Sequence, residues 1–232
     1  MSVKIKNWKL AVLALIIFCL FVRLGMWQVS RANEKKTLLA TYAARMQQTP
    51  VNAKALSQPN DWRFYRAQIV GRFDNQHTVL LDNKTFQGRI GYEVYTPFKA
   101  RGLDNAILVD RGFVPLTSSR AILPTIKNIE GDVTITGLLN LPPTYHALGD
   151  IQDTKDNAWP RRLEFIQLPL VGQLLGYPLF PYILMIEPKN PAAFTIEWQI
   201  VTMSPERHWG YAVQWFALAL TLLILFVALN RD

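Results

Sequence analysis

The residues best suited to bind a metal lie where the last apolar segment of the chain begins. At about 100° per residue, a helix places five of them on one face: His208, Tyr211, Ala212, Trp215 and Ala219. A neutral imidazole is a good ligand for haem iron, small alanines leave room for a flat macrocycle, and aromatic rings can stack on it. This spacing predicts a haem site with His208 as the axial ligand and with Tyr211 and Trp215 beside it.

Two arginines are candidates for the anionic propionates of such a macrocycle. Arg207 precedes the histidine, and Arg23 interrupts the first apolar segment of the chain. A charge inside an apolar span is costly unless it is paired or reaches the interface, so Arg23 is a candidate functional residue. The alternative is that both arginines bind lipid phosphate and that His208 is an ordinary polar residue at the interface.

Catalytic chemistry is not indicated elsewhere. The chain has three histidines, of which His77 precedes a strand-like stretch and His146 lies in a Pro-rich loop. No nucleophile elbow, zinc-protease helix, phosphate-binding loop or dinucleotide fingerprint is present. We therefore predict no catalytic residue and a protein that is not an enzyme. A cleft with His77 or His146 beside a carboxylate and a nucleophile would favour a membrane-tethered enzyme instead.

Two apolar segments predict membrane spans. From Trp209 to Asn230 there is no charged residue, and these 22 residues would reach about 33 Å as a helix, enough for a hydrocarbon core of about 30 Å. Between Lys9 and Arg31 only Arg23 is charged. A cleaved signal peptide is the rival interpretation of the first segment, but its apolar character continues past Arg23 and no small-residue cleavage site follows. We expect a retained anchor.

The predicted organisation is a multi-pass protein of the cell inner membrane with its main domain in the periplasm. Lysines before the first span favour a cytoplasmic N-terminus, and the lack of an Arg- and Ser-rich transit peptide favours a bacterial source. The expected segments are a cytoplasmic N-terminus (1–9), the first transmembrane helix (10–30), a periplasmic β-rich domain with a leading helix (31–208), the second transmembrane helix (209–229) and a cytoplasmic C-terminus (230–232).

Charge and cysteine content limit the partners. The net charge is +8, but the basic residues are scattered and no recognition motif accompanies them. The expected partner is therefore the anionic lipid of the bilayer or an anionic ligand, and not nucleic acid. The only cysteine is Cys19, in the first span. The outer domain therefore has no disulfide and no thiolate metal site.

The middle of the chain changes to a period of two. Strand-like stretches cover 67–73, 77–81, 91–98, 105–110, 132–139, 182–186 and 195–201, a leading helix covers 31–48, a loop covers 50–62, and 163–175 resembles a helix kinked at Pro169. The predicted fold is a membrane protein of the α+β class. Two transmembrane helices, one near each terminus, flank an antiparallel β-rich extracytoplasmic domain, barrel-like or sandwich-like.

Several short motifs follow one another in a familiar order. They are the segments 24–31 (LGMWQVSR), 65–66 (YR), 71–73 (GRF), 91–97 (GYEVYTP), 108–115 (LVDRGFVP) and 208–216 (HWGYAVQWF). Together with the two-span layout, they resemble the Surfeit locus protein 1 family of cytochrome oxidase assembly factors. The chain departs from the family pattern at Glu206 and Arg207, where two asparagines are usual, and at Asp110 and Phe113, which replace Asn and Trp.

The resemblance implies a role in respiratory chain biogenesis, as an assembly factor for haem-copper cytochrome c oxidase. In that interpretation the protein is a chaperone that holds haem a transiently, with His208 as the haem-linked residue, or stabilises oxidase subunit I during haem insertion. Subunit I and haem a synthase are the implied protein partners. The alternative is a membrane-anchored structural chaperone for oxidase subunits that binds no haem. The Arg111-Gly112 pair is expected to form a tight structural turn in which Arg111 pairs with a carboxylate or spans a sheet edge.

Overall fold

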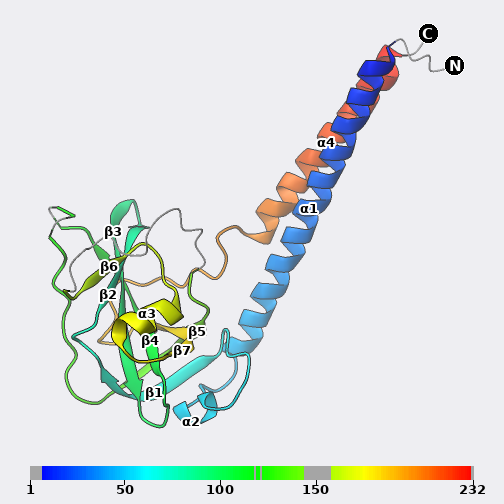
Figure 1. The fold of residues 1–232 in the computed structure, drawn as a ribbon. Coiled ribbons are helices and arrows are strands. Elements are labelled where there is room, and N and C mark those ends of the chain that lie inside the picture. The colour runs from blue at the N-terminus through cyan, green and yellow to red at the C-terminus, as the bar shows by residue number, and fades with distance from the viewer. Residues whose placement is uncertain (1–6, 118, 121, 144–157, 231–232) are drawn as a thin grey trace. The chain divides into compact units, whose positions relative to one another are not determined.

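The computed structural model describes residues 7–117, 119–120, 122–143 and 158–230. The chain forms two compact units. One contains residues up to Thr41 together with Gln199 onwards, and the other runs from Tyr42 to Trp198. The first unit is a pair of helices, and the second is a β-barrel (Figure 1). The predicted α+β class is confirmed.

The helix pair consists of α1 (Trp8–Met46) and α4 (Pro205–Leu229), which run side by side in Figure 1. Buried or half-buried residues recur every seven positions on both helices, which is the seam of a left-handed coiled coil. On α1 they are Ala11, Ala14, Phe18, Phe21, Gly25, Gln28 and Ala32, and on α4 they are His208, Ala212, Trp215, Ala219, Leu222 and Phe226.

Both helices are long and apolar enough to cross a membrane, as judged by length and composition. Their outward faces carry exposed large apolar side chains, among them Leu13, Ile16, Leu220 and Ile224. The predicted helix over 31–48 is confirmed as the continuation of α1, because no glycine or proline interrupts this run of good helix formers.

The second unit is built on one seven-stranded sheet. Its strands are β1 (Arg66–Phe73), β2 (Val79–Phe86), β3 (Arg89–Ala100), β4 (Ala106–Pro115), β5 (Val133–Asn140), β6 (Arg161–Leu163) and β7 (Leu179–Ile186). The order is β1-β5-β7-β4-β3-β2-β6, and a further pairing of β1 with β3 closes five strands into a barrel. The barrel-like prediction is confirmed. The sheet is mixed rather than wholly antiparallel, because β4 pairs with β7, and β2 with β6, in parallel.

Alternation along the strands fills two apolar layers. In β4, Ile107 and Val109 belong to the cluster that also contains Ile69 and Leu184, whereas Leu108 belongs to the cluster that packs on α3 (Leu168–Leu175). Side chains of successive strand residues point to opposite faces, so one strand supplies both layers. Figure 1 shows α3 lying over β4 and β7.

Three sequence predictions need correction. Residues 195–201 do not form a strand; they make one isolated bridge, Phe113 to Thr195, on the part of β4 that lies beyond Asp110, where its pairing with β7 ends. The helix predicted over 163–175 begins only at Leu168, and Pro169 lies in its first turn, where a missing N–H costs nothing. The predicted loop over 50–62 contains the short helix α2 (Ala53–Leu56), capped by Asn52.

Candidate functional site

The candidate site lies where α4 begins and centres on His208. Its imidazole is 7% exposed, and Nδ1 donates to Oε1 of Gln28 on α1 at 2.7 Å. Gln28 is itself 9% exposed. The second imidazole nitrogen, Nε2, makes no hydrogen bond within the described residues. His208 thus has one nitrogen fixed by α1 and one available for a ligand, which is the arrangement that metal-ligating histidines commonly show.

The alanines beneath this histidine are not available to a macrocycle. Ala212 is 1% exposed and Ala219 is 4% exposed, because both lie in the seam that packs against α1. The prediction that a flat ring would lie on them is wrong. Their spacing from His208 is that of a helix-packing face. Small residues suit helix packing as well as they suit ligand binding.

The other predicted site residues on α4 are placed differently from one another. Tyr211 is 44% exposed and lies beside the seam. Trp215 is half-buried and its ring lies 5.7 Å from that of Phe21 on α1. Arg207 is exposed in the first turn of α4. Of these three residues, Tyr211 and Arg207 are exposed and can contact a ligand that reaches His208 from outside the helix pair.

Arg23 does not share this site. It precedes Gly25 by two residues and Gln28 by five, so a turn of about 100° per residue puts it about 170° from the centre of the seam. Its side chain is exposed, and within the described part of the chain no hydrogen bond or ion pair is made to it.

Two short sequence segments that lie 180 residues apart meet in this helix pair. Besides the bond between Gln28 and His208, Gly25 faces the ring of Phe216, and a Cβ at position 25 would lie 2.6 Å from that ring. Gln28 and Gly25 were not among the site residues predicted from the sequence. The signal that would have found them is the seven-residue spacing shared by the two helices.

The enzyme alternative depended on the other histidines. His77 Nδ1 lies 2.9 Å from Asp74 Oδ1, and its ring makes an edge contact with Trp159. Burial by itself would raise the pKa of the Asp74 carboxyl, but hydrogen bonds from Tyr177 and His77 outweigh it and hold the pKa below its usual range. Among the described residues no hydroxyl or thiol is hydrogen-bonded to His77. The pair fixes the turn between β1 and β2, and His146 lies outside the described residues.

A buried polar centre of the barrel lies at Arg111, which is 1% exposed. The register of β3 and β4 shifts here, so that Val94 faces Gly112 and Tyr95 faces Asp110, leaving Arg111 as a bulged extra residue. The expected tight turn is therefore a β-bulge inside a strand, and Arg111 binds backbone carbonyls rather than a carboxylate among the described residues. Burial raises the pKa of the Asp110 carboxyl well above its usual range, and the nearby Glu93 carboxylate adds to this effect.

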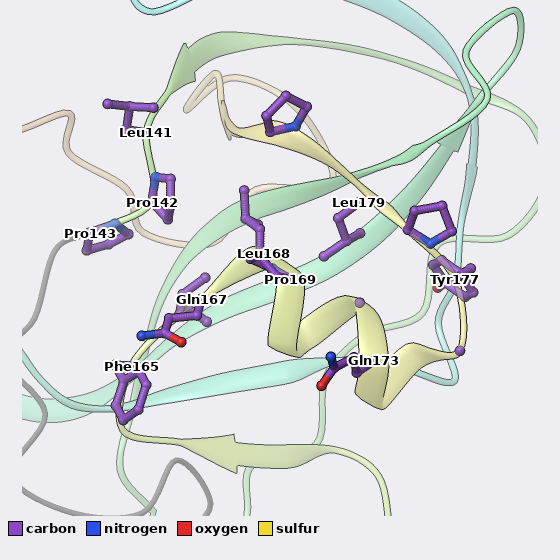
Figure 2. Close-up of a pocket in the computed structure, with 15 residues that line it drawn as sticks. Leu141, Pro142, Pro143, Phe165, Gln167, Leu168, Pro169, Gln173, Tyr177 and Leu179 are labelled. Atoms are coloured by element: carbon purple, nitrogen blue, oxygen red, sulfur yellow. The ribbon is translucent and has the colours of Figure 1, made fainter.

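A groove of about 880 Å³ lies along α3 and the start of β7 (Figure 2). Figure 2 shows its apolar wall, which includes Leu168, Pro169 and Leu179, with the amides of Gln167 and Gln173 at the edge. The hydroxyl of Tyr177, the one titratable group among the described lining residues, donates to Asp74 at 2.7 Å. Burial together with this bond raises the pKa of Tyr177. The described lining residues therefore give the groove an apolar surface but no general acid or base.

The fold and the site define a β-barrel protein flanked by two apolar helices that pair through a buried His–Gln contact. Residues 15–220 match the model of the SURF1 family, and the chain belongs to that family.

Relatives of this chain cover very different shares of it. It is 26% identical over 230 residues to a SURF1-like protein of Rickettsia felis, covering 97% of this chain and 98% of the relative. It is 28% identical over 155 residues to human Surfeit locus protein 1, covering 60% and 52%. It is 25% identical over 109 residues to the yeast cytochrome oxidase assembly protein SHY1, covering 46% and 27%.

Proposed function

We propose that this protein is an assembly factor for haem-copper cytochrome c oxidase, and that it holds haem a transiently at His208 while oxidase subunit I receives it. Membership of the SURF1 family and the name of the yeast relative support the assembly role. The observation that carries the haem proposal is the geometry of His208, whose Nδ1 is fixed by Gln28 and whose Nε2 has no partner within the described residues.

Each residue of the proposed site would make a different contact with haem a. His208 would offer Nε2 to the iron of haem a, for which a neutral imidazole nitrogen is a good ligand. Tyr211 is exposed beside the histidine and would stack against the macrocycle, and Arg207 would pair with a propionate. Arg23 lies on the opposite face of α1, so we assign it to lipid phosphate in place of a propionate.

We further propose that α1 and α4 cross the cell inner membrane and that the barrel lies on the periplasmic side. Support comes from two helices of sufficient length whose outward faces are apolar and exposed. The aromatic residues Trp209 and Tyr211 at the start of α4 suit the interface between bilayer and water. In this arrangement His208 lies at the outer interface, where oxidase subunit I and haem a synthase would be reached.

A second function is favoured by a different observation. The residues that pack between α1 and α4 include Gly25, Ala212 and Phe216. All three belong to the segments that carry the family resemblance. Such residues suit a structural chaperone that steadies oxidase subunit I and never touches haem. The two functions differ in one respect, which is whether an iron ligand is needed at position 208.

The test is haem retention by the full-length protein purified in detergent and loaded with haem a. Wild type is compared with His208→Ala and His208→Met, with His77→Ala as the matched control because His77 also bonds through Nδ1. We expect His208→Ala to lose the bound haem, His208→Met to retain iron with an altered visible spectrum, and His77→Ala to match the wild type. Unchanged spectra and retention in all three variants would refute the ligand role and leave the structural chaperone.

A further inference from the structure

The contact between Gln28 and His208 joins two polar side chains inside an otherwise apolar seam. Both residues are more than nine-tenths buried, and the neighbouring seam residues are Gly25, Ala32 and Ala212. Burying two polar groups among apolar neighbours is costly unless they bond to each other, and at 2.7 Å they do. A leucine at both positions would fill the same seam without that requirement. Packing alone therefore does not explain why a polar pair lies at these two positions.

The chemistry of the two bonded atoms determines which imidazole nitrogen of His208 carries the hydrogen. Oε1 of Gln28 is an amide oxygen and can only accept, so Nδ1 of His208 carries the hydrogen. A neutral imidazole has one N–H and one lone pair, which leaves the lone pair on Nε2. The ring is also held in one orientation, because Gln28 and His208 sit on different helices and the bond ties one to the other.

We infer that Gln28 is a positioning residue that fixes the tautomer and orientation of His208 so that Nε2 presents a lone pair to a metal. This inference rests on the proposed function, since the metal it serves is the iron of haem a. Outer partners of this kind typically change metal affinity about 10- to 100-fold when they are removed. Gln28→Leu should therefore weaken haem retention without removing the ligand itself.

The first arm of the test reads the tautomer without haem. Full-length protein labelled with 15N-histidine is purified in detergent, and the His208 signals are assigned by their absence from His208→Ala. We expect the proton on Nδ1 in the wild type and in Gln28→Glu, whose carboxylate also accepts, and a mixture of tautomers in Gln28→Leu. A proton on Nε2 in the wild type, as a flipped Gln28 amide would produce, overturns the inference. So does an unchanged tautomer in Gln28→Leu.

The second arm measures haem affinity and the midpoint potential of the bound iron. We expect Gln28→Leu to lose affinity about 10- to 100-fold and Gln28→Glu to retain it with a lowered potential, because a carboxylate makes the imidazole a stronger donor. Equal affinity and potential in wild type and Gln28→Leu overturn the positioning role while the haem proposal stands. If the wild type binds no haem, the proposed function fails, and the inference that depends on it fails with it even where the tautomer is as expected.

Discussion

Replacing Arg111 by lysine tests whether the barrel depends on the shape of a buried guanidinium or only on its charge. Arg111 is 1% exposed. Its Nε donates to the carbonyl of Ala192 and its Nη2 to the carbonyl of Lys127, both at 2.9 Å. The guanidinium also lies 4.8 Å from the ring centre of Phe194. Burial lowers the pKa of Arg111 to about 10, so the group is still charged at neutral pH.

The magnitude follows from what lysine cannot reproduce. Both side chains carry one charge, so to first order the cost of burying that charge cancels between wild type and variant. A lysine Nζ is a single point and reaches one of the two carbonyls, and leaving the other unpaired costs about 1–3 kcal/mol. The loss of the planar contact with Phe194 adds about 0.5–2 kcal/mol. We expect Arg111→Lys to lower the free energy of unfolding by about 2–4 kcal/mol, the central part of this summed range.

The measurement is denaturant unfolding of the full-length protein in detergent, followed by tryptophan fluorescence. Arg89→Lys is the matched control, because Arg89 is exposed at the start of β3, and exposed substitutions usually stay within about 0.5 kcal/mol of wild type. If the two variants were equally stable, the carbonyl bonds of Arg111 would contribute nothing. The reasoning that the barrel depends on the shape of this buried guanidinium would then be wrong.

Three further predictions concern a buried acid and two glycines. Burial raises the folded-state pKa of Asp110, so Asp110 stabilises the barrel at a pH below its pKa in the unfolded chain. That stability is lost as the pH rises towards the folded-state pKa, by at most about 1.4 kcal/mol per pH unit. Asp110→Asn should flatten this part of the curve of unfolding free energy against pH, and equal slopes in wild type and variant would count against a buried neutral acid. Gly112→Ala should cost about 2–4 kcal/mol in unfolding measurements, because φ is +102° and the new Cβ would lie 2.6 Å from the carbonyl oxygen of Thr195; a loss below about 1 kcal/mol would contradict the geometry. Gly25→Leu should reduce oxidative cross-linking between cysteines placed on the facing helices about tenfold, because it overpacks the ring of Phe216, and undiminished cross-linking would show that the seam is not close-packed there.

The elements that the sequence predicted well are those whose signal is local. The two apolar helices follow from runs without charge, and α1 could be extended to Met46 because good helix formers continue beyond Arg31. The strands β1, β3 and β4 follow from alternation. The stretch 195–201 alternates too, yet it is not a strand. Alternation reports that one side of an extended segment is buried, whereas a ladder also needs a neighbouring strand with free backbone groups.

The candidate site was predicted only in part, for the same reason. His208 was found because its residue type and its place before an apolar run suggest a ligand. Gln28 was not found, because an amide on a distant helix has no chemistry of its own until the partner beside it is known. The alanines near His208 were assigned to the wrong role for a related reason. Small residues on one helix face suit a macrocycle and a second helix equally well, and only the contact with α1 in the structure shows that they pack against a helix.

By itself, the sequence determined which segments are apolar helices, that the domain between them is rich in strands, and to which family the chain is similar, because all of these depend on local composition, periodicity and short motifs. Tertiary structure alone decided that β7 runs parallel to β4, that Arg111 is a bulged buried cation, and that His208 is held by Gln28. These are contacts between residues far apart in the chain. Their formation depends on how whole elements pack, and no local pattern encodes it.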